Sequence, residues 1–175
     1  YDVYLNLCDG SADEDRPGMD VVQALEMLNL PFTGADSVFY APTREQTQMM
    51  AQRKNIGFPR GLEAKIGDPV EEMVAQAGLR FPLIVKHHES YASVGMTKES
   101  RVENMQQLRT RFDLMCAQYG SARIEEFVDG REFTVLIADN PENLDEPYVY
   151  HPLEIIFPEG ESFKHWAMKF DPNAD

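Results

Sequence analysis

Two hydrophobic periods follow one another at the start of the chain. Residues 3–7 form a short, nearly continuous apolar run, which predicts a strand. Apolar positions then recur at helical spacing over residues 20–28 and stop before Pro31, which predicts a helix. Asp20 and Gln23 have the spacing of a capping box at the start of this helix. A strand, a loop and a helix in this order are half of a doubly wound unit.

Two further helices are predicted before the middle of the chain. Thr43 and Gln46 have capping-box spacing and begin a helix that ends before Gly57. Pro69 follows an aspartate at the start of the next segment, where proline is favoured in the first turn of a helix. An apolar stripe continues from there and ends at Gly78, which indicates a helix packed on the core.

A buried strand and a long helix come next. Residues 81–87 are expected to form a strand, whose apolar run ends at Lys86. A lysine at the end of a buried strand needs an anion, although a surface lysine at a strand end is the alternative. Ser100 and Glu103 have capping-box spacing and predict a helix that continues through Tyr119.

Two carboxylates flank the strongest turn signal of the sequence. Residues 124–128 and 132–136 favour strands, and the Asp-Gly pair at 129–130 predicts a hairpin between them. Glu125 and Glu132 therefore stand in strands on opposite sides of the turn. Burying an unpaired carboxylate costs several kcal/mol, so each needs either a partner or an exposed edge strand. Both interpretations are compatible with this stretch alone.

Composition narrows the classes of function. The 175 residues suit one domain or parts of two, and 43% are hydrophobic, as in globular proteins. With 16 basic and 30 acidic residues the net charge is −14, which argues against nucleic acid as a partner. Cys8 and Cys116 are too few for a disulfide framework, so a reducing cytosol is expected. No membrane span or signal peptide is visible, but the chain begins abruptly at Tyr1 inside an expected strand, so missing upstream residues would hide any targeting signal.

Four segments resemble the ATP-grasp superfamily, and specifically its D-alanine–D-alanine ligase branch. They are L-N-L-P-F-T-G at 28–34, G-F-P at 57–59, F-P-L-I-V-K-H-H-E-S-Y-A-S-V-G-M at 81–96 and E-E-F-V-D-G-R-E-F-T-V at 125–135. Only the last two segments are specific enough to indicate this family by themselves. The resemblance implies an α/β ATP-grasp fold that is truncated here. Its parts would be the end of an N-terminal domain at 1–42, a central nucleotide-gripping subdomain at 43–138 and the start of a C-terminal subdomain at 139–175.

The resemblance also implies a binding site for ATP. Lys86 would meet the nucleotide phosphates. The backbone carbonyl of Glu126 would accept a hydrogen bond from the adenine amine, and the N–H of Val128 would donate one to the ring. Glu132 would bind the ribose hydroxyls, for which a carboxylate is a suitable acceptor. Glu125 would order the pocket from the neighbouring strand.

Three more residues match family positions with roles in catalysis or substrate binding. Ser93 lies in the loop that folds over the phosphates, and Lys169 matches a lysine that reaches the terminal phosphates. Glu14 matches a glutamate that helps to hold the first amino-acid-like or carboxylate substrate. For Glu14, a solvated acidic loop is an equally good interpretation.

The sequence departs from the family pattern in four places. Gln46 stands where a nucleotide-contacting lysine is expected, and Arg44 is a weak substitute for it. Tyr91 and Ala92 replace small residues of the phosphate loop. Phe170 replaces a tyrosine, which leaves D-alanine specificity in doubt.

The family's magnesium ligands would lie downstream of this chain. No metal ligand is therefore assigned here, although Mg²⁺ and ATP are both implied as cofactors. The favoured function is a cytoplasmic ATP-dependent carboxylate–amine ligase of which this chain is a part, inactive by itself. The alternative is a non-catalytic nucleotide-binding or interaction module, and a protein kinase is a poor third because no H-R-D or D-F-G motif follows the lysine strand. Oligomeric state is left open, with a homodimer among the options.

Overall fold

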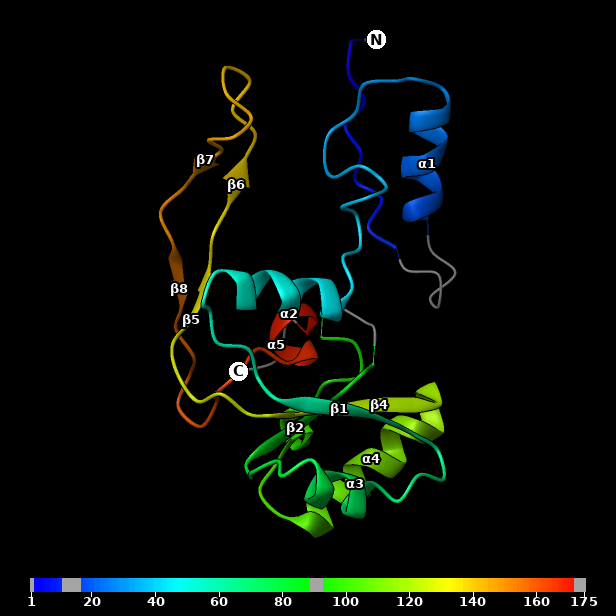
Figure 1. Cartoon of the computed structure of the whole chain (residues 1–175), viewed down its shortest axis with the longest axis vertical. Coiled ribbons are helices and arrows are strands. Elements are labelled where there is room, and N and C mark those ends of the chain that lie inside the picture. Colours follow the sequence, from blue (N-terminus) through cyan, green and yellow to red (C-terminus); the bar gives the residue numbers. More distant parts are fainter. Residues whose placement is uncertain (1, 11–16, 89–92, 172–175) are drawn as a thin grey trace. The chain divides into compact units, whose positions relative to one another are not determined.

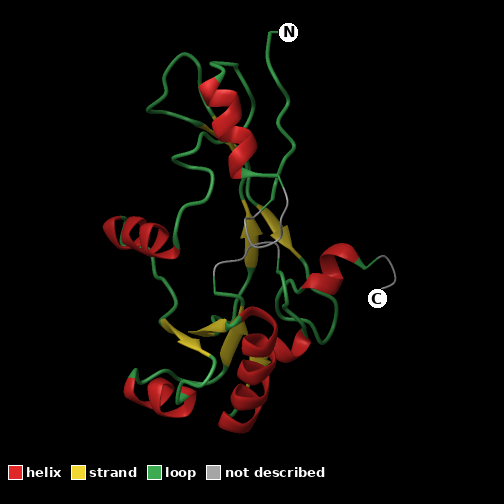
Figure 2. Cartoon of the chain, turned by 90° about the vertical axis from the view of Figure 1, so that its right-hand side faces the viewer, coloured by secondary structure: helices red, strands yellow, loops and turns green. Residues whose placement is uncertain are grey.

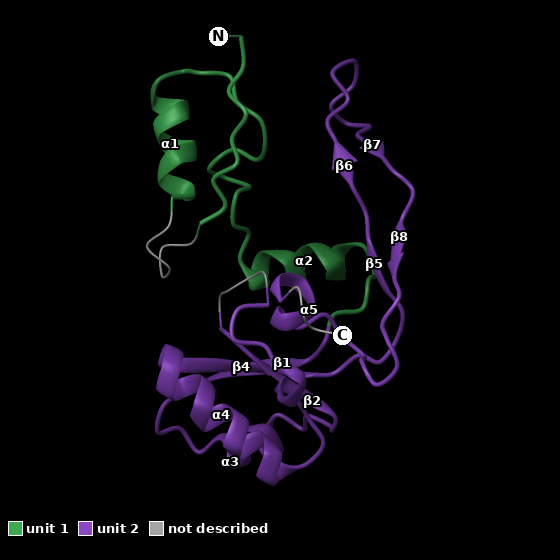
Figure 3. Cartoon of the chain, turned by 180° about the vertical axis from the view of Figure 1, so that it is seen from behind, with its two compact units in different colours: residues 1–58 green, residues 59–175 purple. Residues whose placement is uncertain are grey.

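The computed structural model describes residues 2–10, 17–88 and 93–171. The chain divides into two compact units, Tyr1–Phe58 and Pro59–Asp175 (Figure 3). The three-part division expected from the resemblance, with boundaries after residues 42 and 138, stays a prediction.

The described part of the first unit contains the helices α1 (Met19–Met27) and α2 (Arg44–Arg53). The helix expected over residues 20–28 is confirmed, but its predicted capping box is wrong, because the helix begins after Gly18 and Asp20 already lies in its first turn. The capping box at Thr43 is confirmed in full. The strand expected at residues 3–7 is reduced to one isolated parallel bridge between Tyr4 and Phe32.

The second unit is built on a four-stranded antiparallel sheet with the strand order β1-β4-β2-β3. Helices α3 and α4 lie together on one side of this sheet (Figure 1), and the same layering is visible after a quarter turn (Figure 2). The elements are β1 (Gly61–Lys65), α3 (Val70–Gln76), β2 (Leu83–Lys86), the 3₁₀ turn η2 (Lys98–Ser100), β3 (Arg101–Val102), α4 (Met105–Tyr119) and β4 (Ser121–Glu126).

The core lies between the sheet and these helices. Its buried residues come from alternate positions of the strands, from α3 and from one stripe of α4. They are Ala64, Val70, Val74, Leu83, Val85, Val102, Leu108, Phe112, Met115, Cys116, Ala122 and Ile124. Because Ala122 and Ile124 face this core, the residues between and after them on β4 face the other side of the sheet.

The start of α4 differs from the prediction, whereas its end agrees with it. Asn104 is the N-cap, and its side-chain oxygen accepts a hydrogen bond from the Gln107 N–H at 3.0 Å. Ser100 lies in η2 instead, where its hydroxyl accepts from the Thr97 N–H. The helix ends at Tyr119 as predicted, and Gly120 follows in the left-handed conformation with φ of 80°.

The predicted hairpin at residues 129–130 is wrong. Strand β4 pairs with β1 on one edge and β2 on the other, so it has no free edge for the strand that follows it. That strand, β5 (Glu132–Thr134), pairs instead with β8 (Leu153–Ile155), and β6 (Ile137–Ala138) pairs with β7 (Tyr148–Val149). The Asp-Gly pair therefore connects two sheets.

The described part of the chain ends in the short helix α5 (Trp166–Phe170). None of the helices in residues 2–10, 17–88 and 93–171 combines the length and apolar character that crossing a bilayer requires.

Candidate functional site

A buried carboxylate lies between two cations on β2 and β4. The Lys86 ammonium forms an ion pair with one oxygen of Glu125, and the Arg123 Nε donates to the other oxygen. The three side chains are 17%, 2% and 9% exposed for Lys86, Glu125 and Arg123. Arg123 also reaches the half-exposed carboxylate of Glu63 on β1 at 3.4 Å. We call Lys86, Arg123 and Glu125 the charge cluster.

The sheet register explains this arrangement. Lys86 and Arg123 are directly opposite on β2 and β4, and Glu125 is two residues from Arg123 on the same face. Two cations in direct opposition repel each other, so the carboxylate between them offsets the repulsion. Gly61 is opposite Glu125 on β1, and a Cβ there would lie 2.5 Å from the Glu125 Cγ. The absence of a side chain at Gly61 leaves the space that the glutamate fills.

Glu125 is thus not a solvated acid on an edge strand. It is 1% exposed on a central strand, so that interpretation of residues 124–128 is wrong for this carboxylate. The cost of burying it is offset by two charged donors. The anion that Lys86 was expected to need is present within the protein.

Residues 126–128 continue from β4 at the end of the sheet. The Glu126 N–H donates to the Arg60 carbonyl at 2.8 Å, and its carboxylate accepts from the Arg80 N–H at 3.0 Å. The side chain of Val128 is 70% exposed. The adenine contacts expected from the backbone of Glu126 and Val128 stay predictions.

Glu132 begins β5, and Lys169 lies on α5, 37 residues later in the sequence, yet the two charges influence each other. Burial lowers the pKa of Lys169, the neighbouring charge of Lys164 lowers it further, and the charge of Glu132 partly opposes both. The net pKa is below the ordinary lysine value. The structure therefore brings a predicted ribose ligand and a predicted phosphate ligand to one neighbourhood.

The segment from Ser93 to Met96 is held from two sides. The Ser93 hydroxyl donates to the Lys164 carbonyl at 2.8 Å, and the Met96 carbonyl accepts from the Trp166 N–H at 3.1 Å. On the other side, the buried Arg111 of α4 donates to the carbonyl of Gly95. Ser93 thus lies next to the segment that leads into α5, which carries Lys169.

Three residues named from the sequence lie outside the described residues, namely Glu14, Tyr91 and Ala92. The side chain of Gln46 is used in the α2 capping box, where it accepts from the Thr43 N–H at 2.8 Å. Within residues 2–10, 17–88 and 93–171, no group of three or more His, Cys, Asp or Glu side chains is arranged to hold a metal ion.

Sequence reasoning missed Arg123. The signal was present, because Arg123 and Glu125 alternate with the apolar Ala122 and Ile124 along one strand. A cation at such a position, two residues from a glutamate in the same strand, indicates a pair on one face of a sheet.

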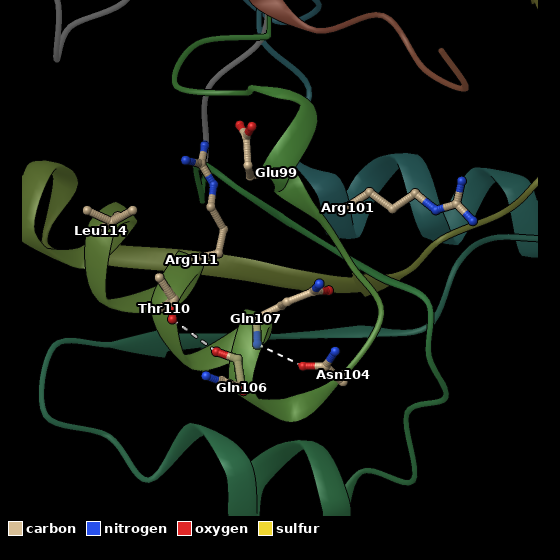
Figure 4. A pocket seen from close by; sticks show the side chains of 8 residues that line it. All are labelled: Glu99, Arg101, Asn104, Gln106, Gln107, Thr110, Arg111 and Leu114. Carbon is tan, nitrogen blue, oxygen red and sulfur yellow. Dashed lines mark hydrogen bonds between the residues drawn. The ribbon is translucent and has the colours of Figure 1, made fainter. Parts of the chain in front are cut away.

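A separate cavity of about 480 Å³ lies at the N-terminal half of α4 and beside η2 (Figure 4). It shares no residue with the charge cluster or with the other predicted site residues. Its lining is Glu99, Arg101, Asn104, Gln106, Gln107, Thr110, Arg111 and Leu114.

Comparisons with known proteins show which family and fold the chain resembles. The family model described as D-ala D-ala ligase C-terminus matches residues 52–174. A D-alanine–D-alanine ligase of Mannheimia succiniciproducens is 31% identical over 176 residues, which cover 97% of this chain and 52% of the relative. The chain thus spans about half the length of that relative.

Solved structures show the same fold. The VanG D-Ala:D-Ser ligase of Enterococcus faecalis superposes with a TM-score of 0.71 at 22% identity, covering 91% of this chain and 44% of the other. D-alanyl-alanine synthetase A of Vibrio cholerae gives 0.70 at 20% identity, covering 99% and 50%. The ATP-grasp fold predicted from the sequence is confirmed, for part of its length. The chain belongs to the family of the D-alanine–D-alanine ligase C-terminal domain.

Proposed function

We propose that this chain is the nucleotide-binding part of an ATP-dependent carboxylate–amine ligase. In this reaction a substrate carboxylate attacks the γ-phosphorus of ATP, forming an acylphosphate and releasing ADP. An amine then attacks the acyl carbon, the C–O bond to phosphate breaks, and an amide and inorganic phosphate are released. The relatives named above catalyse ligation of D-alanine according to their names, and the substrates of this protein belong to the same class of small amino acids.

The observation that carries this proposal is the position of Lys86. It ends β2 in a chain whose residues 52–174 match the ligase family, and it is held by a buried carboxylate on the neighbouring strand. A lysine that is fixed in this way presents its charge in a defined place, and positioning with charge neutralisation is most of what phosphoryl transfer needs from a protein.

The other assignments follow the family pattern. Lys86 and Lys169 neutralise the phosphates, and Ser93 contacts the transferring group. The backbone of residues 126–128 reads the adenine, and Glu132 binds the ribose. Glu125 holds Lys86 in place, and Glu14 contacts the first substrate.

Mg²⁺ is the metal that such a ligase uses to bridge the terminal phosphates. The resemblance places the Mg²⁺ ligands downstream of this chain. We therefore propose that the chain contributes positioning and positive charge to the reaction.

Two thiols, Cys8 and Cys116, are free, which supports a cytoplasmic location. The net charge of −14 argues against nucleic acid as a partner. ATP and small amino-acid-like or carboxylate substrates are the partners that we propose. A homodimer and the division after residues 42 and 138 belong to the same proposal.

A second function, nucleotide binding without catalysis, is favoured by one observation. Gln46 replaces the expected cation, and its amide is committed to capping α2. Such a module would bind ATP and show no dependence on amino acids.

The test uses residues 1–175 and, beside it, the complete reading frame that encodes them. Calorimetry should show tighter binding of ATP than of GTP, because the Glu126 carbonyl can accept from an amine and not from the guanine carbonyl. The complete protein should release ADP only when small amino acids are added, and residues 1–175 should not. Equal affinity for ATP and GTP would contradict the adenine assignment, and ADP release that ignores amino acids would contradict the ligase.

A further inference from the structure

The side chain of Glu126 joins the end of β4 to the segment that connects α3 with β2. One oxygen of its carboxylate accepts a hydrogen bond from the Arg80 N–H at 3.0 Å, and the Arg80 Nε lies 3.6 Å from the same oxygen. The Arg60 Nη1 lies 3.9 Å from that oxygen, while its Nη2 donates to the carbonyls of Ala77 and Gly78 at the end of α3. The Glu126 side chain is 18% exposed, so these contacts are largely shielded from water.

The backbone at the end of β4 is held from two sides. The Glu126 N–H donates to the Arg60 carbonyl at 2.8 Å, and the Phe127 N–H donates to the Pro82 carbonyl at 2.9 Å. Val128 follows directly, and its side chain is 70% exposed. The position of an exposed residue at this place therefore depends on how firmly the two residues before it are held.

We propose that Glu126 is a positioning residue, whose carboxylate fixes the backbone of residues 126–128 for the recognition of adenine. This inference rests on the proposed function, because the adenine is assigned to that backbone there. A hydrogen bond weakens steeply as its angle departs from the optimum. A carbonyl therefore separates an amine from another carbonyl only when it cannot turn away from the ligand. The carboxylate restrains this carbonyl through the side chain of the same residue, before the ligand arrives.

The hydrogen bond from the Arg80 N–H contributes more to this restraint than the two guanidinium groups do. The side chains of Arg60 and Arg80 are 55% and 83% exposed, and water screens ion pairs at 3.6 and 3.9 Å in such places. The backbone N–H has a fixed direction and no such screening. The geometry therefore predicts that glutamine at position 126, which keeps the acceptor oxygen, retains most of the effect. Alanine, which has no acceptor, loses it.

The experiment measures the affinity of the 175-residue chain for ATP, GTP, adenosine and tripolyphosphate by calorimetry. Glu126→Ala should weaken ATP and adenosine about fivefold, the equivalent of one hydrogen bond, and should change tripolyphosphate less than about twofold. The preference for ATP over GTP should fall by a similar factor. Glu126→Gln should restore both to within about twofold. Asp113→Ala is the matched control, because it removes a carboxylate that pairs with Arg109 on the exposed face of α4.

Amide hydrogen exchange in the unmodified chain tests the same restraint without a substitution. The Arg80 amide exchanges when its hydrogen bond to the Glu126 carboxylate opens. Adenosine should slow this exchange more than tripolyphosphate does at the same fractional saturation, because only adenosine contacts residues 126–128 in the proposed site. NMR measures the rate for this single amide. This measurement decides the matter if Glu126→Ala does not fold, and equal slowing by the two ligands would contradict the role of Glu126.

The outcomes separate the two proposals. If the unmodified chain prefers ATP to GTP and Glu126→Ala keeps this preference, the inference is overturned and the nucleotide site stands. Equal weakening of adenosine and tripolyphosphate makes Glu126 a structural brace only, and it also overturns the inference. If the unmodified chain binds neither ATP nor adenosine, the proposed nucleotide site itself is refuted, and the role of Glu126 with it.

Discussion

At the scale of single residues, the buried pair of Lys86 and Glu125 separates a positioned lysine from an ordinary one. A lysine held by a buried carboxylate gives up little further side-chain entropy when it binds an anion. A lysine on a solvated strand surface would have to be ordered at that moment. The entropy cost of binding an anion therefore differs between lysines at different positions of one sheet.

This difference predicts the effect of removing Lys86. Lys86→Met should weaken ATP binding by at least about tenfold, because a charge-assisted hydrogen bond contributes about 1.5–3 kcal/mol. Lys65→Met should change the affinity less than about twofold, since Lys65 is exposed at the far end of β1. Titration calorimetry with ATP on both variants makes the comparison, and equal affinities would remove Lys86 from the site.

Lys98 would not serve as a second control for Lys86, although its side chain is 60% exposed. Its ammonium pairs with Glu161, whose side chain is 6% exposed and lies 3.2 Å from the Nε2 of His165. Removal of Lys98 would therefore leave a buried carboxylate with one partner fewer. An exposed lysine can therefore still stabilise the fold through an ion pair with a buried carboxylate.

Glu161 gives the protein a pH dependence of stability. Burial raises the pKa of this carboxyl, but the hydrogen bond and charge of Lys98, together with His165, outweigh burial, so the pKa is below its usual 4.5. A carboxyl with a lower pKa in the folded state stabilises the fold above the unfolded-state pKa, and this contribution is lost as the pH falls through the folded-state pKa.

Glu161→Gln should therefore lower the free energy of unfolding at pH 7 by about 0.5–1 kcal/mol, the value of a partly exposed ion pair. The difference from the unmodified chain should shrink as the pH falls below about 4.5 and vanish at lower pH. Urea unfolding at a series of pH values measures it. Glu142→Gln, at an exposed position, is the control, and a constant difference across the series would exclude the ion pair as the cause.

At the scale of elements, the start of α4 depends on one cap. Asn104→Ala should lower the free energy of unfolding by about 1 kcal/mol, because the Gln107 N–H loses its acceptor. Glu103→Ala should cost less, since Glu103 forms only a surface ion pair with Arg101. Denaturant unfolding compares the two variants. A larger loss from Glu103→Ala would favour the capping box that the sequence pattern indicates.

Helices and buried strands were predictable because their signals are local. The stripe that ends at Tyr119 and the apolar run that ends at Lys86 each follow one hydrophobic period. The cap of α4 was missed because Ser100 and Asn104 are both good caps, and only the packing of the 3₁₀ turn decides between them. Local spacing does not contain that information.

The prediction of a hairpin at residues 129–130 was wrong for a different reason. The Asp-Gly pair at 129–130 is a good turn signal, but β4 is already paired on both edges by β1 and β2. Which edges of a strand are occupied depends on residues far away in the sequence, as with the register of Gly61 and Glu125. Lys86 and Glu125 could be singled out from the sequence as charged residues in predicted strands, whereas their contact with each other and with Arg123 depends on the sheet register.

At the scale of the whole molecule, the residues that we assign to ligand binding are distributed unequally between the two units. Every described residue assigned to the nucleotide belongs to the unit Pro59–Asp175, whereas Glu14 belongs to Tyr1–Phe58. The chain carries a net charge of −14, so the proposed binding of ATP would depend on local cations that act against the general field. The charge cluster and Lys169 supply such cations within one unit.

This division predicts where ATP changes stability. A ligand that binds only the folded state stabilises it by about 2.7 kcal/mol at 100 times its dissociation constant. Amides of β2 and β4 that exchange by opening of the second unit should therefore exchange about 100-fold more slowly with ATP. Amides of α1 should be unaffected, because α1 lies in the first unit. Hydrogen exchange followed by mass spectrometry, with GTP as the control ligand, measures both. Protection confined to residues 17–58 would place the nucleotide in the wrong unit, and equal protection by GTP would remove the adenine readout from residues 126–128.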